Sequence, residues 1–119
     1  QELLDGAART GLFEQSLDLK AAVAEADVVY TDTWVDMEYF MDPKFKAEKQ
    51  RRTEMMFPYQ LNEALLKDSK ALIMHDMPIH PGYEIDRWAI ESPNSIIFDQ
   101  AENRLHAEKA VLLTQLGKA

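Results

Sequence analysis

Three short apolar runs interrupt a chain whose other apolar residues are mostly spaced as in helices. The runs are residues 27–31 (DVVYT), 71–74 (ALIM) and 95–98 (SIIF), each about as long as a single strand. Continuous runs rich in β-branched residues are typical of strands covered on both faces, as parallel sheets require. We therefore predict three parallel strands.

Residues with helical spacing fill the intervals between these runs. We predict helices at residues 2–10, after a cap at Ser16 or Asp18, and at residues 47–57, 59–67 and 101–116, with a helical turn at 86–90. In the last helix, the apolar residues expected to face the sheet are Leu105, Val111, Leu112 and Leu116. Residues 35–46 have no clean period and contain Pro43, so we predict a mobile loop there. The alternation of helices and strands predicts an α/β fold, one domain over residues 1–119, with a three-layer parallel sheet and flanking helices.

Charge and composition narrow the classes of partner. The net charge of −8 argues against binding to nucleic acid or to an anionic membrane, because both would repel the chain. No apolar run approaches the ~20 residues that cross a bilayer. The chain has no cysteine, so the sequence excludes disulfides and zinc–thiolate sites and fits a reducing compartment. We expect a soluble, cytoplasmic protein.

Acidic residues follow each predicted strand. Asp32 follows the first, His75 and Asp76 follow the second, and Asp99 lies at the end of the third, shortly before Arg104. Ligands of open α/β sheets bind at the carboxyl ends of the strands. If the three strands are neighbours, four side chains are predicted to converge on one crevice: Asp32, His75, Asp76 and Arg104. The simpler interpretation is that they cap helices or hold turns. Only their location, in the loop after the second strand, suggests a role for His80 and Glu84.

Four sequence blocks carry a resemblance to a known family. They are ADVVYTDTWVDM (residues 26–37), FPYQLNEALL (57–66), MHDMP (74–78) and SIIFDQAENRLHAEKAVLL (95–113). In this order and spacing they resemble the carboxyl-terminal, amino-acid-binding domain of the aspartate/ornithine carbamoyltransferases, a Rossmann-like domain. The ornithine branch is the better match, because the aspartate branch would have an arginine where this chain has Ile79.

The resemblance implies transfer of a carbamoyl group from carbamoyl phosphate to an amine, giving a ureido product and phosphate without metal or organic cofactor. Asp32 would contact the attacking amino group, and Arg104 would help to hold the carbamoyl oxygen, where negative charge develops. The backbone around Met77 would accept a hydrogen bond from the carbamoyl nitrogen. The family pattern also implies that the Met77–Pro78 peptide bond is cis.

Further substrate-binding positions implied by the family are Asp36, Met37, His75, Asp76 and Pro78, and Asp76 is also a candidate for catalysis. Two of these depart from the ornithine branch, which has serine in place of Asp36 and cysteine in place of Asp76. Asp36 would repel a substrate carboxylate, whereas Asp76 adds an acid near Asp32 that favours a cationic amine. The identity of the amine therefore stays open.

The family's carbamoyl-phosphate loop, Ser-x-Arg-Thr-Arg, is absent from this sequence. We therefore expect a carboxyl-terminal fragment that lacks the amino-terminal carbamoyl-phosphate domain, is inactive alone, and comes from a protein that is a homotrimer at full length. One alternative is a degenerate α/β interaction module without catalysis. Another is a metal-dependent hydrolase that uses Asp32, His75, Asp76 and His80 as ligands.

Overall fold

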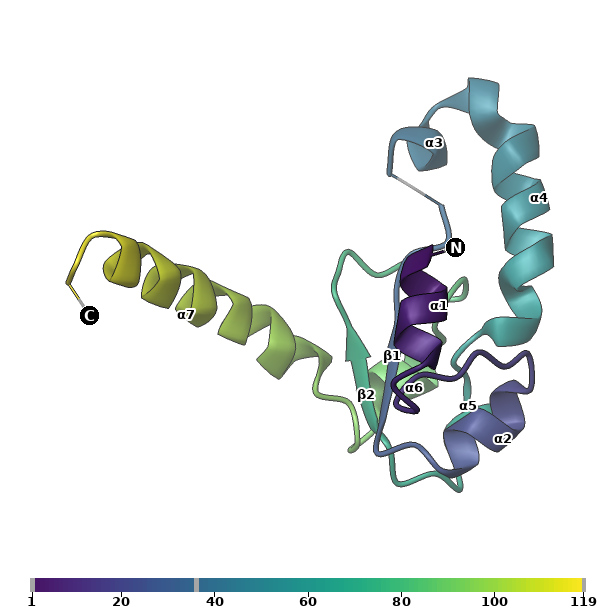
Figure 1. Cartoon of the computed structure of the whole chain (residues 1–119). Coiled ribbons are helices and arrows are strands. Elements are labelled where there is room, and N and C mark those ends of the chain that lie inside the picture. Colours follow the sequence, from purple (N-terminus) through teal and green to yellow (C-terminus); the bar gives the residue numbers. More distant parts are fainter. Residues whose placement is uncertain (1, 36, 119) are drawn as a thin grey trace.

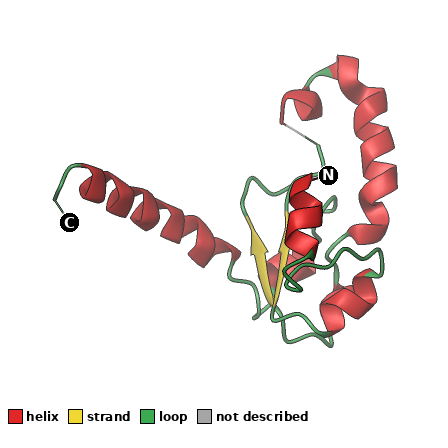
Figure 2. Cartoon of the chain, in the orientation of Figure 1, coloured by secondary structure: helices red, strands yellow, loops and turns green. Residues whose placement is uncertain are grey.

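The computed structural model describes residues 2–35 and 37–118, an α/β arrangement built on a parallel strand pair (Figures 1 and 2). The helices are α1 (Glu2–Ala8), α2 (Leu19–Ala24), α3 (Met37–Met41), α4 (Lys46–Met56), α5 (Glu63–Leu66), α6 (Arg87–Glu91) and α7 (Ile97–Gln115). The strands are β1 (Val28–Thr31) and β2 (Leu72–His75), and 3-10 turns occupy Pro43–Phe45 and Phe57–Tyr59. Within the described residues, no helix has the length and apolar character needed to span a membrane.

The sheet confirms the first two predicted strands and corrects the third. β1 and β2 are parallel, with Val28 opposite Leu72 and Thr31 opposite His75. The predicted strand at 95–98 is wrong: it contributes one parallel bridge, Ser95 to Ile73, and then becomes the first turn of α7. Two backbone hydrogen bonds hold this point, from the Ile73 N–H to Asn94 and from the Ile96 N–H to Ile73. Among the described residues, β1 has no strand on its other edge.

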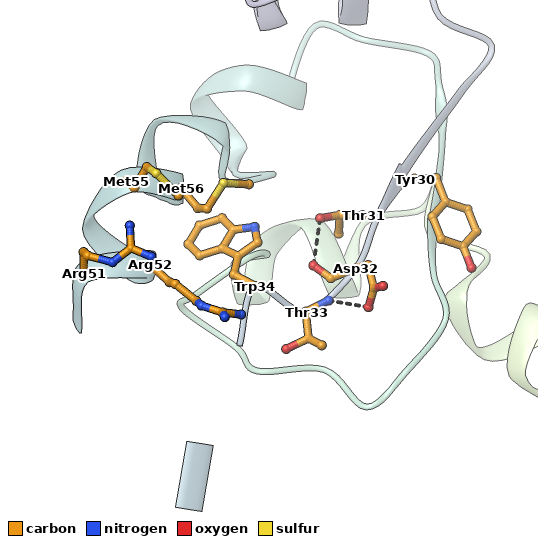
Figure 3. Close-up of a pocket in the computed structure, with 9 residues that line it drawn as sticks. All are labelled: Tyr30, Thr31, Asp32, Thr33, Trp34, Arg51, Arg52, Met55 and Met56. Carbon is orange, nitrogen blue, oxygen red and sulfur yellow. Dashed lines mark hydrogen bonds between the residues drawn. The ribbon is translucent and has the colours of Figure 1, made fainter. Parts of the chain in front are cut away.

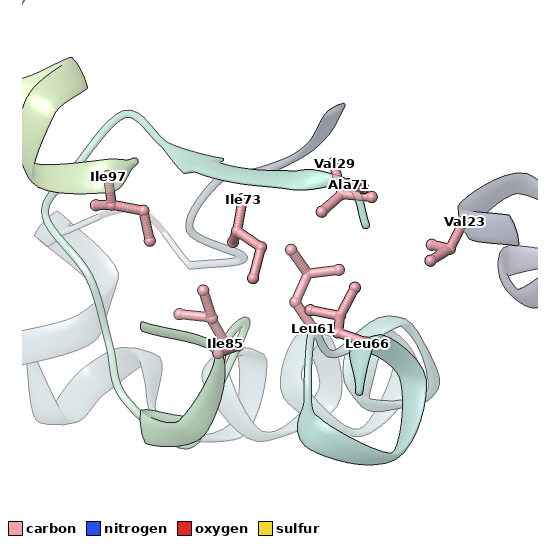
Figure 4. Close-up of a cluster of buried hydrophobic side chains, with 9 residues drawn as sticks. Val23, Val29, Leu61, Leu66, Ala71, Ile73, Ile85 and Ile97 are labelled. Carbon is pink, nitrogen blue, oxygen red and sulfur yellow. The ribbon is translucent and has the colours of Figure 1, made fainter. Parts of the chain in front are cut away.

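The hydrophobic core lies against one face of this sheet (Figure 4). Three isoleucine side chains in it are at most 1% exposed: Ile73, Ile85 and Ile97. Side chains alternate along the strands, so that Val28 and Tyr30 point away from the core and remain 45% and 55% exposed. Burial of the core therefore determines which side chains of β1 face the core and which face away from it.

The region predicted as a mobile loop is mostly helical. Residues 37–56 form α3, a 3-10 turn and α4, so the prediction for residues 35–46 is wrong. Pro43 lies at the start of the 3-10 turn, where its fixed φ is compatible with a helical start, and the Asp42 carboxylate caps the turn by accepting from the Lys44 N–H at 2.9 Å. The proline therefore begins a helical turn here.

Helix α7 extends away from the rest of the molecule (Figure 1). Ile97 is its only buried residue in the described chain. The prediction that its apolar residues face the sheet is wrong, because these side chains are 53% to 71% exposed: Leu105, Val111, Leu112 and Leu116. Since α7 starts at the bridge to β2 and continues past the sheet, only its first turn can reach the core.

Candidate functional site

The register of the parallel strands brings two acids to one edge. Thr31 is paired with His75, so Asp32 and Asp76 each follow directly after paired residues. The Asp32 carboxylate accepts a hydrogen bond from the N–H of Thr33 at 2.6 Å, and the Asp76 side chain is 45% exposed. Both carboxylates are therefore accessible at the carboxyl end of the sheet.

A cavity of about 550 Å³ opens beside Asp32 (Figure 3). One wall is the strand end from Tyr30 to Trp34, and the other is α4, which contributes two arginines and two methionines: Arg51, Arg52, Met55 and Met56. In Figure 3 the indole of Trp34 lies between the methionine side chains and the guanidinium of Arg52. The cavity thus combines a carboxylate, two guanidinium groups and an apolar surface.

Glu48 holds the two arginines of α4 in place. Its carboxylate accepts hydrogen bonds from Arg51 at 2.8 and 2.9 Å and from Arg52 at 2.8 Å. These hydrogen bonds, from Arg51 first and then Arg52, lower the pKa of the Glu48 carboxyl to about 2. The arginine pair was not predicted as part of a site, although the adjacent basic residues one turn after a glutamate were a visible signal for it.

A buried network of hydrogen bonds organises the loop after β2. The Glu84 carboxylate, 1% exposed, accepts from His75 Nε2 at 3.1 Å and from the His80 N–H at 2.6 Å. The other ring nitrogen of His75, Nδ1, accepts from the Met77 N–H at 2.8 Å. Because Met77 must donate, the ring proton is assigned to Nε2, which donates to Glu84. Burial raises the pKa of the Glu84 carboxyl, but the hydrogen bonds from His75 and the backbone and the charge of His80 outweigh it, so the pKa lies below its usual value.

The backbone at Met77 has an uncommon conformation. Its φ is +61°, in the left-handed region that disfavours a residue with a Cβ by about 1–2 kcal/mol. The Met77–Pro78 peptide bond is cis, as the family resemblance implied. The loop therefore departs from regular structure at the residue whose backbone was implicated in binding.

Aromatic contacts fasten α3 to the same loop. The Phe40 ring stacks on His80 with centroids 4.1 Å apart, and Lys49 Nζ lies 3.4 Å from the Phe40 centroid. At these distances the His80 ring and the Lys49 ammonium group cannot both lie on the same face of Phe40, so the Phe40 ring lies between them. Tyr83 adds an edge contact to Phe40 at 5.4 Å. The helix after the Asp32 strand and the loop after β2 are thereby packed together.

The structure brings together only part of the predicted site. Arg104 lies on α7 with its side chain 73% exposed and pairs with Glu108 at 3.1 Å, so the predicted convergence with Asp32 is not formed within this chain. Asp36 lies outside the described residues, and only the backbone of Met37 is described, as the first residue of α3.

The importance of Glu84 was not recognised from the sequence. Only its location in the loop suggested a role, yet its carboxylate is the centre of the buried network. Its position between Tyr83 and Ile85 was the signal in the sequence that it is buried. Among the described residues, no group of three or more His, Cys, Asp or Glu side chains could hold a metal ion.

Comparison with known proteins connects this geometry to a family. Residues 3–115 match the family model described as aspartate/ornithine carbamoyltransferase, Asp/Orn binding domain. Curated relatives include the ornithine carbamoyltransferases of Archaeoglobus fulgidus, 50% identical over 103 residues, and Methanopyrus kandleri, 47% identical over 102 residues. The alignments cover 85% and 84% of this chain but 32% and 31% of the relatives, so the chain spans about a third of their length.

Solved structures agree with this assignment. The ornithine carbamoyltransferase from Pyrococcus furiosus is 44% identical with a TM-score of 0.74, covering 92% of this chain and 34% of that chain. A structure of N-acetyl-L-ornithine transcarbamylase is 30% identical with a TM-score of 0.65, covering 83% and 29% respectively. Because the family match takes in residues 3–115 of the 119, this chain belongs to the aspartate/ornithine carbamoyltransferase family, as an Asp/Orn binding domain of the ornithine branch.

Proposed function

We propose that this chain is the amine-binding half of a carbamoyltransferase. The enzyme transfers the carbamoyl group of carbamoyl phosphate to an ornithine-like or other cationic amine and releases phosphate and a ureido product. The observation that carries this proposal is the family match over residues 3–115, which spans Asp32 and the loop with the cis Met77–Pro78 bond. The relatives named as ornithine carbamoyltransferases support the reaction class.

The carboxylates that follow β1 and β2 are suited to binding the amine substrate. Asp32 would hold the incoming ammonium group and orient the nitrogen once it has lost a proton, and Asp76 supplies a second acceptor for that proton. The backbone carbonyl of Met77 would accept a hydrogen bond from the carbamoyl nitrogen. The reaction requires no cofactor from this chain.

Charge of both signs in the cavity favours an amine that also carries a carboxylate. Asp32 supplies the negative side, and the guanidinium groups of Arg51 and Arg52 supply the positive side. A substrate carboxylate near these arginines would be attracted by their positive charge. We therefore propose an amino acid with a side-chain amine as the acceptor.

The second half of the site would come from an amino-terminal domain that binds carbamoyl phosphate. The exposed apolar residues of α7 support this, because a helix with such a surface is normally covered by protein. We propose that Arg104, on the same helix, holds the carbamoyl oxygen when α7 is covered by that domain. We expect the full-length protein to be a cytoplasmic homotrimer and this chain alone to be inactive.

The test is a carbamoylation assay of the full-length protein with carbamoyl phosphate and a panel of amines: ornithine, N-acetylornithine, lysine, putrescine and aspartate. A ureido product from a cationic amino acid, with less from putrescine, is the expected result, because putrescine lacks the carboxylate. Asp32→Asn should reduce the rate about a hundredfold, whereas the matched change at the exposed Asp68, on the α5–β2 connection, should leave it unchanged. Equal rates for ornithine and putrescine would contradict the role of the arginines.

A non-catalytic interaction module is the second candidate. It is favoured by the departures from the family pattern at Asp36 and Asp76. No ureido product from any amine, together with no binding of carbamoyl phosphate by the full-length protein, would support this candidate and refute carbamoyl transfer. Product formed by the isolated chain would refute the requirement for a second domain.

A further inference from the structure

Glu84 is a buried carboxylate that does not line the cavity beside Asp32. It is 1% exposed, and one of its oxygens, Oε1, accepts both hydrogen bonds, from His75 and from the backbone of His80. A buried charge is unfavourable unless its partners are well placed, so such a group constrains the position of whatever donates to it. The two donors here come from the end of β2 and from the middle of the loop that follows it.

His75 carries this constraint to the backbone of Met77. The ring is completely buried and is held at both nitrogens, by Glu84 at 3.1 Å and by the Met77 N–H at 2.8 Å. A shift of the ring toward either partner would lengthen the hydrogen bond to the other. The position of the Glu84 carboxylate therefore determines where the acceptor for the Met77 N–H lies.

Met77 needs this anchor because its φ of +61° is unfavourable for a residue with a side chain. With the N–H held by His75, rotation of the Met77 backbone is restricted, and the direction of its carbonyl is restricted with it. In the proposed function that carbonyl receives the carbamoyl nitrogen. The three residues thus form a chain of contacts from a buried carboxylate to a substrate-binding backbone group.

We propose that Glu84 is a positioning residue for carbamoyl transfer: through His75 it holds the Met77 backbone in the conformation that receives the carbamoyl nitrogen. This inference rests on the proposed function for its catalytic consequence.

The test compares three variants of the full-length protein. Glu84→Leu removes both acceptor oxygens, Glu84→Gln retains one of them in a side chain of similar shape, and Glu91→Gln changes a glutamate that is 66% exposed and pairs with Arg87. Two quantities are measured: the hydrogen exchange rate of the Met77 amide, and the steady-state constants for carbamoyl transfer. The Ile73 amide, in the middle of β2, serves as the internal reference.

In Glu84→Leu we expect Met77 exchange to accelerate at least about tenfold, and the KM for carbamoyl phosphate to rise about tenfold to a hundredfold while the KM for the amine changes little. Glu84→Gln should show smaller changes in the same direction, and Glu91→Gln should show none. If the leucine variant does not fold, the glutamine variant decides.

Unchanged Met77 exchange in both Glu84 variants would overturn the inference. So would equal acceleration at Met77 and Ile73 with equal rises in both KM values, because that pattern indicates general loosening of the fold. If the wild-type protein forms no ureido product, the proposed function fails separately, and Met77 exchange alone then decides whether Glu84 positions this loop.

Discussion

Two substitutions of His75 separate the two hydrogen bonds that its ring makes. His75→Asn keeps an acceptor near Nδ1, because an asparagine side chain readily accepts from the N–H two residues later, here that of Met77. It cannot reach Glu84. His75→Gln has the opposite effect, because its terminal amide extends to about the position of Nε2 and can donate to Glu84, but it leaves the Met77 N–H without its acceptor.

The structure sets the expected sizes of these effects. An N–H that loses its acceptor costs up to about 1–3 kcal/mol when it is fully buried, and less at Met77, which is 36% exposed, whereas a buried carboxylate that loses a donor costs more. We expect His75→Asn to lower the free energy of unfolding by about 3 kcal/mol, with the space left by the smaller side chain adding to the loss, and His75→Gln to lower it by about 1–2 kcal/mol. The expected order of the losses in kcat/KM is the reverse. The value should be about tenfold lower in His75→Asn, which keeps an acceptor for the Met77 N–H, and about a hundredfold lower in His75→Gln, which does not.

Two measurements on the full-length protein test this reversal. Urea unfolding followed by tryptophan fluorescence gives the free energy of unfolding, and the carbamoylation assay gives kcat/KM. The exposed control is Asp68, on the α5–β2 connection, whose substitution by asparagine should change neither quantity appreciably. If the less stable variant is also the less active one, the two hydrogen bonds of His75 do not have separate roles and the reasoning is refuted.

Three further predictions concern the core, α3 and pH. Ile73→Ala should lower the free energy of unfolding by about 2–5 kcal/mol, because the side chain is 1% exposed, and a change below about 1 kcal/mol in urea unfolding would contradict this. Phe40→Ala should loosen α3 and speed tryptic cleavage after Lys44 several-fold, whereas unchanged cleavage would show that the aromatic contacts do not hold α3. Because the pKa of Glu84 is lowered by folding, its stabilising effect is present above the usual value of 4.5 and is lost as the pH falls through the lowered value. The difference in unfolding free energy between wild type and Glu84→Gln should therefore shrink at acidic pH, and a constant difference would contradict an ionised Glu84.

The strands that could be predicted are those whose local pattern and tertiary pairing agree. Residues 28–31 and 72–75 are rich in apolar residues, and they pair with each other. Residues 95–98 have a similar pattern, but only Ser95 bridges to the sheet before the backbone turns into α7. A short apolar run fits a buried first helical turn as well as a strand, and sequence alone does not distinguish them.

Site residues at the ends of the strands could be predicted from the sequence, whereas contacts that depend on how the loops fold could not. Asp32 and Asp76 were found because parallel strands present their carboxyl ends at one edge. The partnership of His75 with Glu84 depends on how the eight residues between them turn back, which no periodic pattern encodes. Arg104 was predicted from a family motif, but in this chain its helix, α7, extends away from the edge of the sheet where Asp32 and Asp76 lie (Figure 1).

The edge of β1 that pairs with no other strand in the described part of the chain has a consequence for handling the protein. An unpaired strand edge offers backbone donors and acceptors to any other extended chain, and here exposed Val28 and Tyr30 side chains lie on the same strand. Neither proline nor lysine interrupts the strand, so it lacks the features that commonly prevent edge-to-edge pairing. When produced by itself, this polypeptide is therefore prone to self-association through β1, and replacing Val28 with lysine is the simplest change to keep it dispersed at high concentration.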